Sequence, residues 1–362
     1  MEYLITNVTL LTGTIITSIT NSANGTASPE KRVKRAQRIV REISITVYVM
    51  AFLLGTTGNG LVIFFTTFRM KKTVSVVWFL NLAIADFIFT FLLIFRIVHL
   101  AMDYHWPFGR FMCNLDVGIF YINLFSSLFL ITIISIDRLI AIKFPVWCQN
   151  HRTPRLASIV TLVVWVLAFI LSLPYAMFMD TTKVENVVYC LSNYSNDKDV
   201  AMSRNSGVTI TRFIVGFVLP LTVIVLCYTV ILSHIRKNYM TKSSKPLKMI
   251  AAIIILFFVC WFPYHVFSLL RLSIKYRGKG RFGNVVRTGM HYCKILAIMH
   301  SCVNPILYVF MGRDFKEKFR SSIQSVFEKA FSEETVQTSF KRSSQLMSLN
   351  SCKLKPYLQN NM

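Results

Sequence analysis

Seven long apolar runs constrain this chain more than any other feature of its sequence. They lie at 43–68, 75–99, 110–142, 156–178, 208–235, 247–272 and 289–311. A helix rises about 1.5 Å per residue, so each run is long enough to cross a bilayer core of about 30 Å. Within lipid, a helix satisfies its own backbone N–H and C=O groups. The sequence therefore predicts an all-α fold, a seven-transmembrane helix bundle.

The composition favours a membrane protein over a soluble enzyme or a nucleic-acid-binding protein. Hydrophobic residues make up 54% of the chain and charged residues 15%, against about 25% charged in soluble domains. The net charge is +24, but Lys and Arg gather at the ends of the apolar runs and in the tails, as is usual at membrane flanks. No inverted repeat relates the two halves, which disfavours a transporter.

Glycosylation sequons indicate the topology. They begin at Asn7, Asn24 and Asn193, and glycans are added on the lumenal side. The counts of basic loop residues do not separate the two sides of the membrane, so the sequons decide the orientation. We therefore expect an extracellular N-terminus on a multi-pass protein of the plasma membrane. Cys113 and Cys190 then face the oxidising compartment, where they can form a disulfide; two free thiols are the alternative.

Asp86 lies deep in the second run, where an ionised carboxylate costs at least about 2.5–3.5 kcal/mol. We expect Asn123, Ser127 and Asn304 at a comparable depth. Their oxygens can complete a site for a small cation, with sodium as the best candidate, and a water-filled network is the alternative. No other cofactor is expected. Because Asp86 is the one deep acid that we expect, without a Ser/His or metal-ligand set, we predict no enzyme.

Other polar and proline residues in the runs indicate a switch. Asp137 and Arg138 end the third run, where an ion pair can latch one state and release it in another, although alone the pair is a weak signal. Pro263 and Pro305 each remove a backbone donor and kink the sixth and seventh helices. Tyr308 follows Pro305 by about one turn. Together, these spacings are far more specific than each motif alone.

The chain resembles the rhodopsin-like (class A) family of G-protein-coupled receptors over residues 43–331. The residues that carry this resemblance are Gly58-Asn59, Asn81 to Asp86, Asp137-Arg138, Trp165, Pro220 with Tyr228, Cys260 to Pro263 and Asn304 to Tyr308. Within the family it resembles the chemoattractant branch, which holds formyl-peptide, chemerin and prostaglandin D2 chemoattractant receptors. The segments that carry this narrower resemblance are Tyr104 to Gly109, Pro145 to Thr153, Thr211 to Phe213 and Lys245 to Lys248.

The resemblance implies that a ligand enters from outside, that the sixth helix swings outward, and that inhibitory-type G proteins couple around Arg138, with Tyr228 as part of the switch. Three positions depart from the family pattern. Leu139 replaces a common Tyr, which this branch often lacks. His300 stands where relatives tend to carry a small polar or amide residue, which counts against the sodium site. Ile94 replaces a kinking Pro, so the outer pocket can differ in shape.

Three cations near the outer ends of the runs indicate the chemistry of the ligand. They are Arg96, Arg212 and Lys294. A buried cation in lipid demands an anion, so we expect an anionic peptide or a carboxylate lipid, and the resemblance implies that Arg212 is the best placed. The aromatic residues expected around the ligand are Tyr121, Trp261, Tyr264 and Phe267. Snorkelling to headgroups is the alternative, above all for Arg96 and Lys294.

The chain is expected to divide into four parts. These are an extracellular glycosylated N-terminus (1–42), the bundle (43–311), a short amphipathic eighth helix (312–331) and a disordered cytoplasmic tail (332–362). Phosphorylation of Ser and Thr in the tail by receptor kinases can recruit arrestin. A scavenging or atypical receptor, which recruits arrestin without G-protein signalling, is the alternative function.

Overall fold

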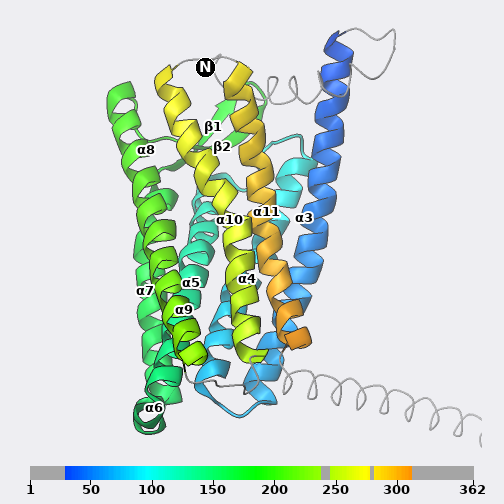
Figure 1. The fold of residues 1–362 in the computed structure, drawn as a ribbon. Coiled ribbons are helices and arrows are strands. Elements are labelled where there is room, and N and C mark those ends of the chain that lie inside the picture. The colour runs from blue at the N-terminus through cyan, green and yellow to red at the C-terminus, as the bar shows by residue number, and fades with distance from the viewer. Residues whose placement is uncertain (1–28, 238–244, 278–280, 312–362) are drawn as a thin grey trace, which may run out of the picture. The chain divides into compact units, whose positions relative to one another are not determined.

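The computed structural model describes residues 29–237, 245–277 and 281–311, and these are mostly helical (Figure 1). The helices that carry the apolar runs are α3 (Pro29–Phe68), α4 (Val74–Ala101), α5 (Gly109–Lys143), α7 (Pro154–Met177), α8 (Lys198–Phe213) with α9 (Leu219–Lys237), α10 (Lys245–Arg277) and α11 (Arg281–Met311). Within the described ranges, six helical stretches are long and apolar enough to cross a membrane. The eighth helix predicted at 312–331 lies outside the described residues.

Capping side chains fix where two of the helices begin. Thr73 accepts a hydrogen bond from the N–H of Val76, and Thr153 accepts one from Leu156, each over 3.3 Å. Such caps satisfy N–H groups that have no partner within the helix. Pro154 occupies the first turn of α7, where its fixed φ suits a helix and its missing N–H costs nothing.

The fifth apolar run forms one helical stretch interrupted by a π-helical turn. The stretch begins at Lys198, ten residues before the predicted start, because Asp197 accepts from the N–H groups of Asp199 and Val200 and caps α8. The turn η1 (Ile214–Val218) separates α8 from α9 and is followed by Pro220, which has no N–H to donate. Such turns are frequent at functional sites, and this one directly follows the end of α8.

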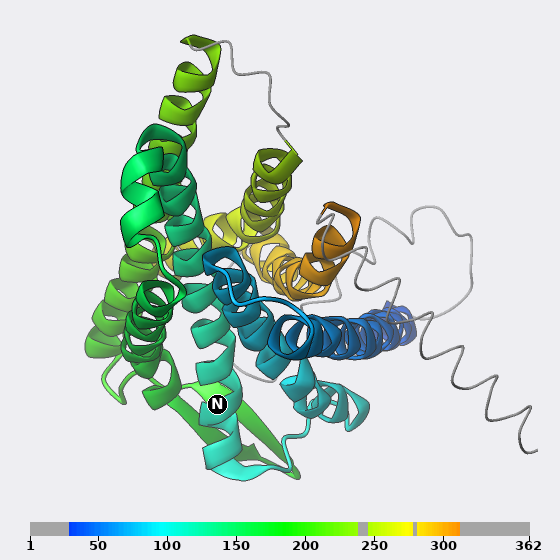
Figure 2. The same cartoon turned by 90° about the horizontal axis from the view of Figure 1, so that it is seen from below.

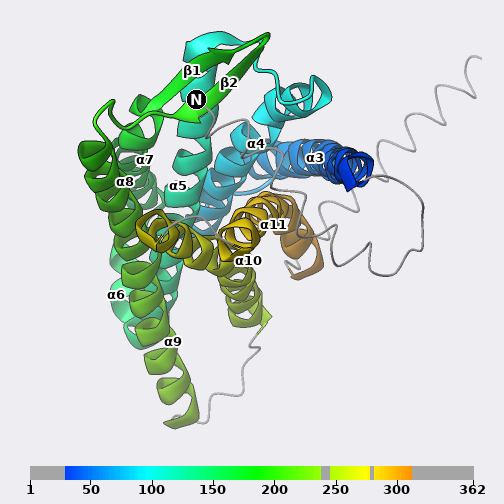
Figure 3. The same ribbon diagram turned by 90° about the horizontal axis from the view of Figure 1, so that it is seen from above.

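A β-hairpin between the fourth and fifth apolar runs corrects the prediction of an all-α fold. The antiparallel strands are β1 (Met179–Val184) and β2 (Val187–Ser192), and Figure 3 shows them at the end of the bundle near α5, α7 and α8. Glu185 in the tight turn has a φ of 53°. Beyond the apolar runs, strand pairing satisfies backbone groups that water would otherwise solvate, so the requirement for a helix no longer holds.

A disulfide links Cys113 at the start of α5 to Cys190 in β2, with the Cα atoms 5.7 Å apart, as predicted. The backbone N–H of Trp106 also donates to the C=O of Val188 over 2.8 Å. Asn193 is exposed directly after β2, whereas Asn7 and Asn24 lie outside the described residues. The hairpin is therefore tied to the bundle covalently and by backbone hydrogen bonding.

Helix α5 lies among the other helices, contacting α4, α7, α9 and α10 as well as β1, and Figure 2 shows the bundle along its length. At another contact, α3 packs against α11 where Gly58 faces Pro305. A Cβ on Gly58 would stand 3.1 Å from the proline ring, tighter than ordinary van der Waals contact. The Asn59 amide donates to the C=O of Ser301 over 2.9 Å beside it. The small size of Gly58 and the hydrogen bond of Asn59 therefore allow α3 and α11 to pack closely here.

Candidate functional site

Three tyrosines from three helices surround the guanidinium of Arg212. The ring centroids of Tyr121 in α5, Tyr175 in α7 and Tyr264 in α10 lie 5.5, 5.6 and 5.1 Å from the guanidinium carbon. One Nη also donates to the Tyr121 hydroxyl over 2.8 Å. Only 6% of the residue is exposed. Electron-rich ring faces attract a cation, so the three rings hold the guanidinium in place.

Contacts among the tyrosines fix this cage. The hydroxyls of Tyr121 and Tyr264 are 2.9 Å apart, and the rings of Tyr121 and Tyr175 stack with centroids separated by 3.8 Å. The Tyr175 hydroxyl donates to the C=O of Val208 over 3.0 Å. Tyr175 was missing from the predicted site, because nothing in the sequence relates it to Tyr121 or Tyr264 until the helices pack.

The Arg212 guanidinium has no acidic partner in the part of the chain that the structure describes. Its Nε is buried and has no hydrogen-bond partner there either. A buried charge is costly unless it is paired, and cation–π contacts offset only part of that cost. The cage therefore presents a positioned donor whose natural complement is an oxyanion.

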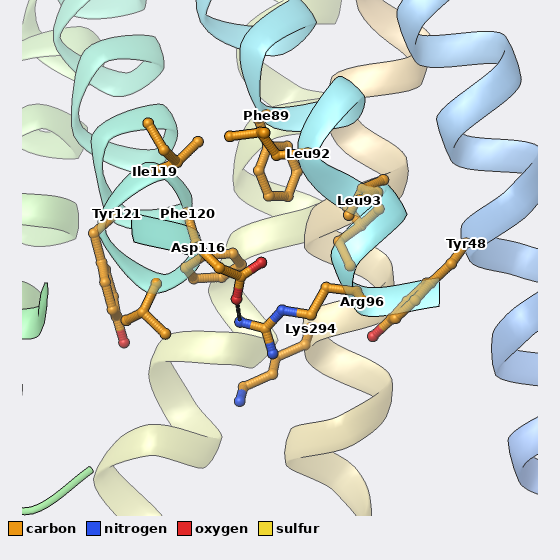
Figure 4. Close-up of a pocket in the computed structure, with 12 residues that line it drawn as sticks. Tyr48, Phe89, Leu92, Leu93, Arg96, Asp116, Ile119, Phe120, Tyr121 and Lys294 are labelled. Atoms are coloured by element: carbon orange, nitrogen blue, oxygen red, sulfur yellow. Dashed lines mark ion pairs between the residues drawn. The ribbon is translucent and has the colours of Figure 1, made fainter. Parts of the chain in front are cut away.

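The other two predicted cations, Arg96 and Lys294, both line a cavity between α3, α4, α5 and α11 (Figure 4). Arg96 forms an ion pair there with Asp116, and Lys294 extends from α11 into the same cavity. Asp116 is 8% exposed, so a second acid besides Asp86 is buried within the bundle. Tyr48 and Tyr121 also line the cavity. With two cations against one acid, the lining carries a net positive charge.

Trp261 lies buried beside both regions, but Phe267 does not. Trp261 is 1% exposed, with its ring centroid 5.6 Å from that of Phe120 and 5.8 Å from that of Tyr264. The Phe267 ring instead fills the space where a Cβ on Gly289 would stand, at the contact of α10 with α11. Phe267 is three residues beyond Tyr264, roughly 60° around the helix, which turns its side chain toward α11.

Deep in the bundle, the carboxylate of Asp86 accepts hydrogen bonds from two side-chain amides. Asn123 donates over 3.0 Å and Asn304 over 2.7 Å. Ser127 does not reach the carboxylate: its Oγ, like the Oδ1 of Asn304, is buried and has no hydrogen-bond partner among the described residues. A carboxylate with a neighbouring unsatisfied amide oxygen suits a hard cation such as sodium, so Asp86, Asn123 and Asn304 fit that ion, and the contribution of Ser127 stays a prediction.

His300, the residue that counted against the ion, does not bond to this cluster. Its ring lies edge-on to Phe257 of α10, with centroids 5.1 Å apart. Both ring nitrogens are buried and have no hydrogen-bond partner among the described residues. The imidazole therefore packs between α10 and α11 and donates no hydrogen bond to the carboxylate of Asp86.

At the other end of α5, the carboxylate of Asp137 is shared between two arginines. Arg138 approaches it over 3.2 Å and donates to the Ser75 hydroxyl over 2.6 Å. Arg152 donates to both carboxylate oxygens, over 2.7 and 2.9 Å, and hydrogen bonding to Asp137 raises the pKa of Arg152 above its ordinary value. The predicted Asp137–Arg138 pair is thus joined by a stronger partner that the sequence did not single out.

The remaining predicted switch residues lie on α9, α10 and α11. The Tyr228 hydroxyl is buried and has no hydrogen-bond partner in the described part of the chain. Pro263 and Pro305 lie inside α10 and α11. The side chain of Tyr308 is outside the described residues.

Residues 58–308 match the family described as 7 transmembrane receptor (rhodopsin family). This chain belongs to the rhodopsin family of receptors. It is 45% identical over 316 residues to human (Homo sapiens) chemerin-like receptor 1, covering 84% of this chain and 83% of that protein. It is 41% identical to chemerin-like receptor 2 of Rattus norvegicus, covering 81% and 82%, and 41% identical to N-formyl peptide receptor 3 of Pan troglodytes, covering 82% and 88%.

As a rhodopsin-family receptor of the chemoattractant branch, the chain is a multi-pass plasma-membrane protein that transmits a signal and is not an enzyme. Membership implies an extracellular ligand and a G protein as partners. The family and branch predicted from the sequence motifs are confirmed.

Proposed function

We propose that this receptor binds an anionic peptide or a carboxylate lipid from outside, with an extracellular N-terminus, and activates inhibitory-type G proteins. The observation that carries the proposal is the cage around Arg212: a buried guanidinium with a free Nε donor and no acidic partner among the described residues. A ligand oxyanion supplies the missing partner, and a charge-assisted hydrogen bond to it is among the stronger polar contacts.

The charges that line the neighbouring cavity also favour an anionic ligand. Arg96 and Lys294 oppose a single acid, Asp116, on the lining. Tyr121 lines the cavity and also accepts a hydrogen bond from Arg212. An elongated ligand can therefore reach the cage and the cavity together, with aromatic surface between them. Chemerin-like and N-formyl peptide receptors among the relatives make peptides the first class to test.

The test uses ligand pairs that differ only in the acid group. Chemerin-type peptides, formyl peptides and long-chain lipids are each applied as the carboxylate and as the amide, to the receptor reconstituted with a purified inhibitory-type or stimulatory-type G protein. We expect nucleotide exchange on the inhibitory type with a carboxylate, and a much weaker response with its amide. Equal potency of acid and amide for an active ligand would overturn the anion assignment.

Coupling and regulation are tested separately. Exchange on the stimulatory type alone would overturn the coupling, and arrestin recruitment without exchange on either type would establish the scavenging alternative. The proposed receptor kinases and arrestin act on the tail at 332–362, which lies outside the described residues, so their test is recruitment to a receptor truncated after Phe331.

A further inference from the structure

A groove opens between α4, α5, α7 and the short helix α6 (Pro145–His151), at the end of the bundle opposite the hairpin (Figure 1). Six of the thirteen residues that line it are aliphatic residues of α5 and α7. At its edge, Leu156 is 45% exposed and Trp147 is 46% exposed. The groove is thus lined largely by apolar side chains and opens at an edge where large apolar side chains are exposed.

One polar group on the groove wall has no partner. Trp78 lines the groove and is 4% exposed, and its indole N–H is buried without a hydrogen-bond partner among the described residues. A buried tryptophan N–H usually finds an acceptor: Trp165 donates to the Asn81 side chain over 3.0 Å. The Trp78 N–H therefore calls for an acceptor, such as an ester carbonyl, that comes from outside the chain.

The rim of the groove is basic. Lys72, Lys143 and Arg155 are exposed, and each lies within three residues of a lining residue along the chain. The one acidic residue among the lining residues is Asp137, and Arg152 already neutralises it. An anionic headgroup at this rim therefore meets cations that the groove lining does not compensate.

We propose that the groove binds an anionic phospholipid of the surrounding bilayer. An acyl chain fills the apolar walls, an ester carbonyl accepts from the Trp78 N–H, and the headgroup phosphate lies against the three basic rim residues. Under the proposed orientation this is the cytoplasmic leaflet, where anionic lipids gather. The lipid binding itself does not depend on which agonist the receptor takes.

A lipid bound in the groove also affects the ion pairs of Asp137. Asp137 and Arg152 both line the groove, so a seated lipid excludes water from one side of their ion pair and strengthens it. Through Asp137, the lipid influences the arginine that the family uses in coupling, Arg138. A lipid in this position stabilises the arrangement seen in this structure.

Cys148 supplies a reporter inside the groove. It lines the groove and is half-buried, whereas the other free cysteines among the described residues are buried. The full-length receptor carrying Cys352→Ser is placed in nanodiscs of phosphatidylcholine alone or mixed with phosphatidylserine, and the rate of maleimide labelling is measured. We expect phosphatidylserine to slow labelling of Cys148 several-fold.

Substitutions of the basic rim residues test whether they cause the slower labelling of Cys148. Lys143→Gln and Arg155→Gln should each weaken phosphatidylserine binding roughly fivefold, from about 1 kcal/mol per basic residue near an anionic surface. Trp78→Phe keeps an aromatic side chain but removes the N–H donor, and it should also reduce protection. The matched control is Lys237→Gln, at the end of α9, which contributes no residue to the groove; it should leave protection unchanged.

A second cysteine position corrects for any general effect of a negative surface on thiol reactivity. Val146 is 71% exposed on the same short helix and does not line the groove, so Val146→Cys combined with Cys148→Ser should label at the same rate in both lipids. Equal slowing at positions 146 and 148, or protection that survives both rim substitutions, would overturn the proposal and leave ordinary boundary lipid.

Discussion

Arg152 donates to both carboxylate oxygens of Asp137, over 2.7 and 2.9 Å. Arg138 reaches the same carboxylate over 3.2 Å and is also held by Ser75. A bidentate arginine–carboxylate pair is stronger than a single contact, so Arg152 takes the larger share of the Asp137 charge. The hold of Asp137 on Arg138 therefore depends on a residue that lies outside α5.

Opposite changes in signalling are expected from substitutions of Asp137 and of its second partner, Arg152. Asp137→Asn removes the carboxylate and should raise agonist-independent activation of the G protein. Arg152→Gln leaves that carboxylate to Arg138 alone, which tightens their pair and should lower both basal and agonist-stimulated activation. Nucleotide exchange on the reconstituted inhibitory-type G protein measures both effects, with receptor amounts matched by surface labelling.

The control for those two variants is Arg155→Gln, which removes an exposed charge three residues along the chain from Arg152. It should leave basal exchange near the wild-type value in phosphatidylcholine alone. A shift of the same sign in Asp137→Asn and Arg152→Gln would contradict the sharing of Asp137.

Arg212→Met should reduce the potency of a carboxylate agonist about ten- to a hundredfold. The physical reason is the loss of a hydrogen bond to a charged group, worth about 1.5–3 kcal/mol. Arg204→Met is the matched control, because it removes one positive charge from the same helix α8, where the exposed Arg204 guanidinium lies over the ring of Phe178. Dose–response curves for calcium release or nucleotide exchange make the comparison.

That potency loss should be specific to the acid group. Wild type and Arg212→Met should differ far less in their response to the amide of the same ligand, since a neutral amide cannot form an ion pair with the guanidinium of Arg212. If Arg204→Met costs as much potency as Arg212→Met, general electrostatic attraction explains the effect and the cage does not.

Arg96 and Asp116 should behave as a coupled pair in a double-mutant cycle. Arg96→Met or Asp116→Asn alone leaves a poorly compensated charge at the cavity and should lower the melting temperature of the purified receptor. The double substitution should recover part of that loss, because neither charge remains. Additive losses in the double variant would show that the two side chains are independent.

Sodium should stabilise the receptor through the Asp86 cluster. Sodium chloride should raise the melting temperature of the wild type above its value in the same concentration of choline chloride, because a bound cation stabilises the folded state. Asp86→Asn should abolish that difference, and Ser127→Ala should reduce it. The same sodium-dependent rise in Asp86→Asn would mean that the ion acts elsewhere.

The sequence by itself determined the membrane architecture and the family of this receptor. Apolar runs long enough to span lipid leave a helix as the answer, since backbone groups there must pair within their own segment. The motifs at Asp137-Arg138 and around Pro263 and Pro305 are local strings, so spacing along the chain was enough to recognise them. The partners Cys113 and Cys190 followed from the compartment alone.

Only the tertiary structure decided how the charges are paired. Three contacts join different segments of the chain: Asp116 with Arg96, Arg152 with Asp137, and Tyr175 with Arg212. The rotation of each helix about its axis decides which side chains come into contact, and the sequence pattern does not determine that rotation. The same rotation turned Phe267 toward α11 and left Ser127 short of Asp86. Periodicity predicts that a helix forms, but packing against its neighbours decides which residue meets which.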